Sequence, residues 1–240
     1  MENPLLKDNK KVDLRVYVLI ASLNPLVVLY QDGWVKQCIL PYEQNIDEND
    51  NDWKFKHITN VQFQFQQKYY QINKEIVGEL CYSSVKFKDF LKQEKNLGDK
   101  ELAALNEEAQ KIIAYSIMSA KDKLIDRKGS FQLIGVDLIL DENLNIKLIE
   151  LNCNAGLNSD FKCQKYVIPQ LIQSNFDLIL ETQSNLSTLK QKWEEPDKLE
   201  LGRWQIVINE AANYNILDNY LLQNKNKIQE KKNRQKLIEL

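Results

Sequence analysis

Apolar residues in the first third of the chain occur in short runs that have the length of strands. Residues 12–21 (VDLRVYVLIA) are rich in β-branched and aromatic side chains and end before Asn24-Pro25, which breaks strands. Gln31-Asp32-Gly33 is typical of a hairpin turn, because aspartate and glycine favour turn conformations. The pattern predicts strands over residues 12–21, 26–30, 34–40 and 60–66.

Helical periodicity follows in the middle of the chain. Between residues 101 and 125, apolar side chains recur at the spacing of one helix face, which predicts a long amphipathic helix. Ser84 is a suitable N-cap for a shorter helix that ends near Leu91. A helix over residues 163–182 is expected to be interrupted at Pro169, because proline lacks a backbone N–H.

The last quarter is mostly polar. Residues 184–201 read as a connector, residues 202–209 (GRWQIVIN) predict a late strand, and the sequence beyond Gln223 is rich in lysine. Strands and helices in this order predict an α+β fold, with an antiparallel sheet packed against helices.

Charge and hydropathy limit the class of protein. The 240 residues carry a net charge of −2, so no basic field marks a nucleic-acid-binding surface. The longest apolar run, residues 16–23, is interrupted by Ser22 and is too short to span a membrane. The first residues lack the apolar core of a signal peptide. We therefore expect a soluble intracellular protein without nucleic-acid or membrane partners.

The cysteines and the single histidine form no recognisable metal-binding pattern. Cys38, Cys81, Cys153 and Cys163 are scattered, without a C-x-x-C pair, and His57 stands alone. These spacings indicate neither a Cys/His zinc site nor a disulfide scaffold. We expect Cys153 to be a small space-filling side chain rather than a nucleophile.

The most informative segment is residues 130–154 (SFQLIGVDLILDENLNIKLIELNCN), where three oxygen-bearing side chains interrupt apolar strands. Asp137 lies in the first strand, and Glu150 and Asn152 lie in the second. A two- or four-residue loop centred on residues 143–144 would place Asp137 directly opposite Glu150. Glu150 and Asn152, two residues apart, then point to the same face.

Two interpretations of these three side chains are open. The first is that the two carboxylates are solvated, as acidic residues near the ends of a hairpin usually are. Facing carboxylates within apolar sequence would instead repel each other, and their burial is unfavourable unless a cation or hydrogen-bond donors compensate the charge. Two carboxylates and an amide supply the all-oxygen ligands that Mg²⁺ prefers, commonly together with nucleotide phosphates. The hairpin therefore predicts half of a magnesium–nucleotide site.

With these elements in place, the chain resembles the tubulin–tyrosine-ligase-like family of ATP-grasp protein–amino acid ligases. Residues 12–19 (VDLRVYVL) are similar to the D-x-R strand of that family, and residues 56–60 (KHITN) to its H-[LI]-T-N element. Residues 130–152 are similar to its F-x-L-x-G-x-D…E-x-N ending, and residues 3–6 (NPLL) to the end of its adenine-binding hinge. The region after Asn152 is most similar to the polyglycylase branch.

The resemblance implies a reaction. Asp137, Glu150 and Asn152 would hold Mg²⁺ between the β- and γ-phosphates of ATP, and Asn152 would also contact the nucleotide. A side-chain carboxylate of tubulin, or of another acidic protein tail, would attack the γ-phosphate and give an acyl phosphate. The amino group of a free glutamate or glycine would then displace the phosphate and form an amide.

Further roles come with the same resemblance. Arg15, Lys36 and His57 would act in catalysis, and Asp13, Arg15 and Asn60 would contact the nucleotide. Arginine suits phosphates and carboxylates because its planar fork donates two parallel hydrogen bonds. The alternatives are that Arg15 forms a surface ion pair with Asp13, and that His57, as a lone histidine, is structural.

The sequence also departs from the family pattern. Lys36 stands where the family usually has an arginine, so the charge is kept but the bidentate fork is lost. The lysine that usually follows H-[LI]-T-N is absent there, and Lys68 is a displaced candidate. Ala155 stands where proline is common. The similarity covers residues 3–181 and begins within the family's domain, so we expect the N-terminal subdomain, with its phosphate-binding lysine, to be missing.

These observations predict three parts. They are a partial tubulin–tyrosine-ligase-like ATP-grasp domain (residues 1–182), a connector with a late strand or helix (183–223) and a charged lysine-rich tail (224–240). The predicted function is an ATP-dependent ligase that attaches glutamate or glycine to tubulin. The expected location is the cytoplasm and the cytoskeleton, with the cilium or the basal body as candidate sites. The alternative is a truncated non-catalytic remnant or a tubulin-binding module.

Overall fold

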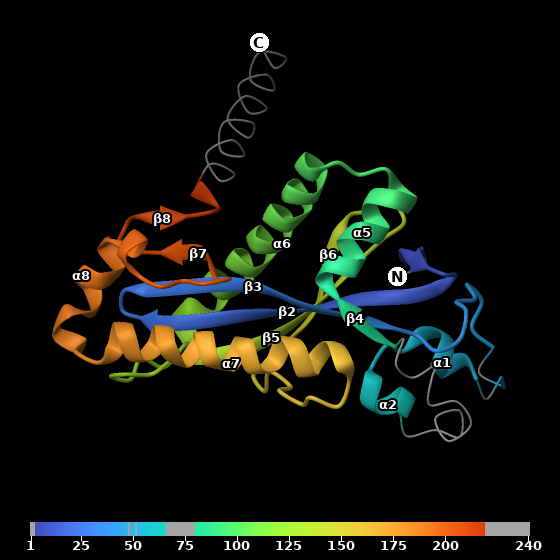
Figure 1. Ribbon diagram of the computed structural model, residues 1–240, viewed down its shortest axis with the longest axis horizontal. Helices are drawn as coiled ribbons and strands as arrows, with labels where there is room; N and C mark the ends of the chain where they lie inside the picture. Colours follow the sequence, from blue (N-terminus) through green and yellow to red (C-terminus); the bar gives the residue numbers. More distant parts are fainter. Residues whose placement is uncertain (1–2, 48, 51, 66–79, 219–240) are drawn as a thin grey trace, which may run out of the picture.

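One curved antiparallel sheet with helices on both faces organises the structure, which confirms the expected α+β class (Figure 1). The computed structural model describes residues 3–47, 49–50, 52–65 and 80–218. The main path of the sheet is β6–β5–β2–β3–β7–β8, with β1 beside β2 and β4 beside β3. The strands are β1 (Leu6–Lys7), β2 (Lys10–Leu23), β3 (Leu26–Gln37), β4 (Cys81–Ser83), β5 (Gln132–Leu140), β6 (Ile146–Asn152), β7 (Gln205–Asn209) and β8 (Tyr214–Asn215).

The helices lie in three places. Two of them, α5 and α6, cover one face of the sheet, whereas α7 and α8 cover the other, and the short helices α1 and α2 lie at one end (Figure 1). Their bounds are α1 (Trp53–His57), α2 (Val61–Phe65), α5 (Ser84–Lys95), α6 (Asp99–Ala120), α7 (Lys162–Gln183) and α8 (Leu189–Glu194), with single 3₁₀ turns at Lys121–Lys123, Leu186–Thr188 and Pro196–Lys198.

The predicted hairpin turn at Gln31-Asp32-Gly33 is wrong. Strand β3 runs without interruption through these residues, and the chain reverses at Asn24-Pro25 instead. The register between β2 and β3 shifts at this point, which leaves Gly33 as the extra residue of a β-bulge. A Cβ atom on Gly33 would lie 2.4 Å from the Arg15 carbonyl oxygen, so the glycine marks a close approach of two strands rather than a turn.

The predicted strand over residues 60–66 is also wrong, because α2 forms there. The Asn60 side-chain oxygen accepts a hydrogen bond from the Phe63 N–H (3.2 Å), as an N-cap does. Gln64 then points inward, where its Oε1 accepts from the Ile39 N–H (2.7 Å) and its amide donates to the Ile58 carbonyl. Tertiary contacts of Gln64 thus decide the local structure. Gln66 and Lys68 lie outside the described residues.

The predicted long helices are confirmed, with different ends. Ser83 rather than Ser84 caps α5, because its hydroxyl accepts from the Lys86 N–H (3.3 Å). Helix α7 continues through Pro169, contrary to expectation. Its apolar side is buried on both sides of the proline, at Ile168 and Leu171 among others, and this burial outweighs one lost backbone hydrogen bond.

The C-terminal connector is partly helical, and the late strand is confirmed. Helix α8 anchors the connector through Trp193, which is fully buried. Strand β7 pairs with β3, so it belongs to the same sheet as the N-terminal strands. The division of the chain near residue 182 stays a prediction, and the tail, residues 224–240, lies outside the described residues.

Strand β2 contributes to two hydrophobic cores by simple alternation. Tyr17 and Leu19 face the core under α7, whereas Val16 and Val18 face the core under α6. Towards its beginning, the α7 side of β2 becomes charged. Here the structure places the candidate site.

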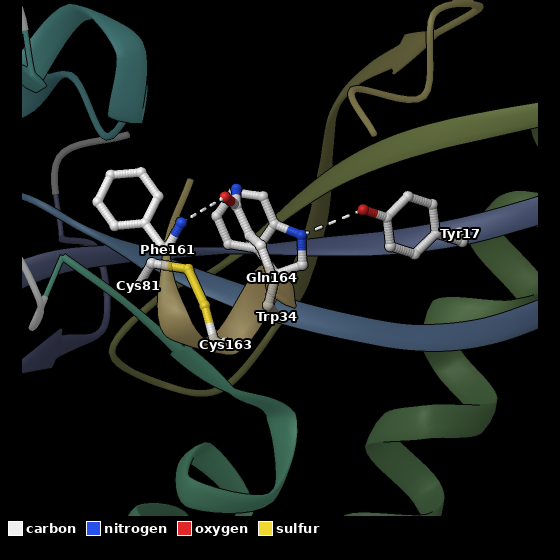
Figure 2. The surroundings of a disulfide bond; sticks show 6 residues. All are labelled: Tyr17, Trp34, Cys81, Phe161, Cys163 and Gln164. Carbon is white, nitrogen blue, oxygen red and sulfur yellow. Dashed lines mark hydrogen bonds between the residues drawn. A yellow bond between two sulfur atoms is a disulfide. The ribbon is translucent and has the colours of Figure 1, made fainter. Parts of the chain in front are cut away.

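Cys81 and Cys163 form a disulfide, contrary to expectation (Figure 2). They are 82 positions apart and come together because β4 lies against the first turn of α7, a contact that cysteine spacing does not reveal. Cys38 is buried and Cys153 is exposed, so Cys153 does not fill space in a core as we expected.

Candidate functional site

All of the predicted site residues line one open cleft. It has a volume of about 630 Å³ and lies beside the charged part of the sheet, between the α1–α2 segment and the beginning of α7. The predicted residues in its lining are Asp13, Arg15, Lys36, His57, Asn60, Asp137, Glu150 and Asn152. The structure therefore brings together residues that lie up to 139 positions apart in the sequence, from Asp13 to Asn152.

Charged side chains cross four neighbouring strands in a row. Lys36 of β3 lies opposite Asp13 of β2, and Arg15 of β2 lies opposite Asp137 of β5. Asp137 in turn lies opposite Glu150 of β6, as predicted, but the predicted loop is wrong. The strands pair as Leu140 with Ile146, so the loop is centred on Asn143, and a bulge between Asp137 and Leu138 restores the predicted pair. Because facing residues in antiparallel strands have adjacent side chains, the row pairs opposite charges at Lys36–Asp13 and Arg15–Asp137, and it places two like charges side by side at Asp137–Glu150.

Asp137 is the centre of this row. Its carboxylate accepts hydrogen bonds from Arg15 Nε (2.6 Å), Arg15 Nη2 (3.1 Å) and Lys36 Nζ (2.8 Å). Arg15 is thus paired with Asp137 rather than with Asp13, and two cations of the chain itself compensate the carboxylate. Burial acts to raise the pKa of Asp137, but Arg15 and Lys36 hold that pKa below its ordinary value.

Asp13 is buried in a different environment. Lys36 Nζ lies 3.2 Å from its carboxylate, and the Thr59 hydroxyl donates a hydrogen bond to it. Burial nevertheless raises the pKa of Asp13 above its ordinary value, against the lowering effects of Lys36 and Thr59. Asp13 therefore ties the segment after α1 to the sheet, which is a positioning role.

The backbone around Arg15 explains the glycine in the F-x-L-x-G-x-D pattern. Arg15 Nη1 donates to the Ala155 carbonyl (3.0 Å), and the guanidinium lies against Gly135 and Gly156. A Cβ on Gly135 would lie 2.8 Å from the Ala155 oxygen and 3.0 Å from Arg15 Nη1. Gly135 thus provides the space that lets the loop after β6 close over Arg15.

We expect Gly135→Ala to lower the free energy of unfolding by about 1–3 kcal/mol, because the added methyl group overpacks this contact. Urea unfolding would measure the effect. Gly98→Ala is the control, since its Cβ would meet only the movable end of the Glu101 side chain, and its cost should be about 1 kcal/mol or less. Equal costs for the two variants would contradict this account of Gly135.

Glu150 and Asn152 project from the outermost strand beside this row. The Asn152 amide donates to Glu150 Oε1 (3.1 Å), so the two side chains face the same cleft. Within the described part of the chain, no group of three His, Cys, Asp or Glu side chains can hold a metal ion. The set Asp137, Glu150 and Asn152, with two carboxylates and an amide oxygen, still fits a hard cation such as Mg²⁺, because each carboxylate can accept more than two contacts.

His57 and Asn60 border the cleft from the α1–α2 segment. The His57 ring packs edge-on against Tyr42, with 5.0 Å between ring centroids, and its buried Nε2 has no hydrogen-bond partner among the described residues. Burial lowers the pKa of His57, and the charge of Lys11 lowers it further, so the imidazole is neutral at neutral pH. A neutral histidine with an unsatisfied nitrogen is suited to a hydrogen bond with a ligand.

Sequence reasoning missed several residues of the cleft. Thr59 lies inside the H-[LI]-T-N element, so this motif could have indicated that Thr59 belongs to the site. Lys11 donates to the His57 carbonyl (2.8 Å), and only its place two residues before Asp13 hints at the site. No periodicity indicated the lining residues from the loop after β6 and the first turn of α7, which are Asn154, Gly156, Asn158, Asp160, Phe161 and Gln164. The other lining residues are Trp34 of β3, Ile149 of β6, and Ile58, Val61 and Gln62 of the α1–α2 segment.

The sequence is similar to those of known proteins. Residues 1–188 match the sequence model of the Tubulin-tyrosine ligase family. The chain therefore belongs to the tubulin-tyrosine ligase family, whose fold is of the ATP-grasp type.

Three relatives illustrate the range of named activities. The chain is 30% identical over 184 residues to an inactive polyglycylase, TTLL10 of Homo sapiens, which covers 76% of the chain and 27% of that protein. It is 31% identical, with 76% and 26% coverage, to the protein polyglycylase TTLL10 of Rattus norvegicus. It is 30% identical over 218 residues to the probable alpha-tubulin polyglutamylase Ttll1 of Tetrahymena thermophila, with 90% and 51% coverage. The chain thus spans about half or less of the length of these relatives.

No helix in the described ranges is both long enough and apolar enough to cross a membrane.

Proposed function

We propose that this chain carries the catalytic cleft of an ATP-dependent ligase that forms an amide between glutamate or glycine and a side-chain carboxylate of tubulin. The row of charged side chains from Lys36 to Glu150, open to a cleft on one face of four strands, is the observation that carries the proposal. The names of relatives, polyglycylases and a polyglutamylase, support the substrate class.

The residues of the row divide into two groups with different tasks. Asp137, Glu150 and Asn152 would hold Mg²⁺, which supplies charge neutralisation for phosphoryl transfer when it is bound. Arg15 and Lys36 place two positive charges next to these ligands, where phosphate or carboxylate oxygens can be bound. Cation-binding oxygens and anion-binding nitrogens in direct contact are what a metal–nucleotide complex requires.

Neighbouring residues of the chain orient Arg15 and Lys36, and other residues of the cleft are placed to contact the substrates. The Ala155 carbonyl and Asp137 orient the Arg15 guanidinium, and Asp13 orients Lys36. His57 is neutral at neutral pH, and its Nε2 would form a hydrogen bond with the nucleotide or with the tubulin carboxylate. Asn60 borders the same part of the cleft and would contact the nucleotide.

The test is an incorporation assay. Purified protein is incubated with Mg-ATP, microtubules and either labelled glycine or labelled glutamate, and the label on tubulin is counted. We expect one of the two amino acids to be incorporated, and only with ATP. No incorporation of either amino acid into tubulin would refute the ligase proposal for this chain. The assay also identifies the donor amino acid.

A second candidate function is a tubulin-binding module without catalysis. Lys36 favours it, because both of its anionic neighbours, Asp13 and Asp137, belong to the chain and its point charge offers no bidentate fork. Co-sedimentation with microtubules in the absence of ATP would measure binding separately. Binding without any incorporation would favour this module over the ligase.

A further inference from the structure

The disulfide between Cys81 and Cys163 lies next to residues that line the cleft, among them Trp34, Phe161 and Gln164 (Figure 2). Cys81 of β4 is the cross-strand partner of Lys36, which belongs to the charged row. Phe161 and Gln164, which flank Cys163 at the beginning of α7, both line the cleft. The bond therefore connects the strand next to Lys36 with the opposite wall of the cleft.

The covalent link fixes one end of the loop that closes over Arg15. This loop leaves β6 after Asn152, and its Ala155 carbonyl accepts from Arg15 Nη1 (3.0 Å). It ends at Phe161, whose N–H donates to Gln164 Oε1 (3.1 Å) in the first turn of α7 (Figure 2). Because Cys163 lies in that turn, the disulfide restrains the loop at the end remote from Asn152.

The surroundings of Cys163 favour thiol–disulfide exchange. Cys163 is half-buried, whereas Cys81 is buried, so Cys163 is the more accessible residue of the pair. Cys163 is in the first turn of α7 between the exposed Lys162 and Lys165. Helix N-termini and nearby lysines stabilise a thiolate, so Cys163 is a good leaving group once it is bound to the reductant.

We propose that the Cys81–Cys163 disulfide is a redox-controlled clamp on the cleft, which holds the loop of residues 153–164 in place when oxidised and releases it when reduced. The proposal deepens the proposed function, and its effect on Mg-ATP rests on that function. Disulfides in reducing compartments are usually transient or redox-sensing, which agrees with a regulatory role for an enzyme of tubulin.

The reductant is a dithiol. One of its thiolates attacks the Cys163 sulfur, the S–S bond breaks, and the Cys81 sulfur leaves with the electron pair and takes a proton. The second thiol of the reductant attacks its own mixed-disulfide sulfur, which releases the Cys163 thiolate. The Cys163 thiolate then takes up the proton lost by the second thiol, so that two electrons and two protons pass to the protein and the dithiol becomes a cyclic disulfide.

The experiment compares the full chain, purified in air, before and after treatment with dithiothreitol. Non-reducing peptide mapping first establishes whether Cys81 and Cys163 are linked. Hydrogen exchange of residues 153–164 and the Kd of Mg-ATP are then measured in both states. On reduction we expect exchange in this segment to become faster by about tenfold and Mg-ATP binding to weaken about tenfold, which corresponds to about 1.4 kcal/mol.

Two variants complete the design. Cys163→Ser should behave like the reduced wild type in either condition, whereas Cys153→Ser, which changes an exposed free thiol, should keep the full response to dithiothreitol. Chemical reduction of the wild type serves as the test if Cys163→Ser does not fold.

The outcomes separate the clamp from the ligase. Absence of the link, or equal hydrogen exchange in the two states, overturns the clamp. If hydrogen exchange of residues 153–164 becomes faster on reduction but the Kd of Mg-ATP does not change, the disulfide does not control the cleft. Faster exchange in a protein that binds no Mg-ATP in either state supports the clamp and counts against the proposed function.

Discussion

Asp137→Asn is expected to lower the free energy of unfolding by roughly 3–5 kcal/mol, because it removes the anion shared by two buried cations. Arg15 and Lys36 both donate to the Asp137 carboxylate at 2.6–3.1 Å. An asparagine keeps the shape but lacks the charge, so Arg15 would lose its carboxylate partner and Lys36 would keep only Asp13, while both side chains stay buried or nearly so. Urea unfolding at neutral pH would measure the loss through the shift in midpoint.

The matched control for this variant is Glu142→Gln, which neutralises an exposed carboxylate in the turn of the same hairpin. It should change the free energy of unfolding by about 0.5 kcal/mol or less.

A pH series is a second test of the role of Asp137. The pKa of Asp137 lies below its ordinary value of 3.8, so its stabilising charge is present above that pH and is lost as the pH falls below it. The difference between wild type and Asp137→Asn should therefore shrink below pH 3.8, and a difference that grows there would contradict the assignment.

Glu150→Gln should differ from Asp137→Asn, because we expect a large loss of ligand binding and little change in the free energy of unfolding. Glu150 is exposed, its carboxylate is in contact with Asn152, and it lies opposite Asp137, so removing its charge removes a repulsion. We expect Mg-ATP affinity and any incorporation activity to fall more than about 100-fold, since even outer partners of metal ligands cost about 10- to 100-fold. Calorimetric titration with Mg-ATP and urea unfolding give the two quantities.

Lys147→Gln is the control for that variant, because it changes an exposed charge on the same strand away from the cleft. It should leave Mg-ATP affinity within about twofold, a difference of about 0.4 kcal/mol. If Glu150→Gln instead unfolds the protein and spares nucleotide binding, Glu150 is structural and the metal assignment is wrong.

The local part of the site could be predicted from the sequence, because a short hairpin leaves few possible registers. The pair of Asp137 and Glu150 was predicted from a loop centred on residues 143–144, whereas the structure forms this pair with a loop centred on Asn143 and a bulge between Asp137 and Leu138. The D-x-R strand was predicted because residues 12–21 are rich in β-branched and aromatic side chains. In both cases, neighbours in sequence decide the outcome.

Contacts between distant segments could not be predicted in this way. The pairing of Arg15 with Asp137 depends on β2 lying next to β5, and Lys36 reaches Asp137 only because the bulge at Gly33 sets the register of β3. The helix α2 depends on the inward contacts of Gln64, and alternation of polar and apolar residues cannot report them. The disulfide of Cys163 depends on the docking of α7 on β4 in the same way.

The position of β6 at the end of the sheet has a consequence for the behaviour of the protein in solution. An outermost strand presents backbone groups that can pair with another copy, and β6 also exposes Ile149 and Leu151. Charged side chains such as Glu150 oppose this self-association by repulsion and hydration. The carboxylate assigned to the chemistry is thus also a gatekeeper against aggregation, so a cation that neutralises Glu150 would stabilise the cleft and favour edge-to-edge association of free chains.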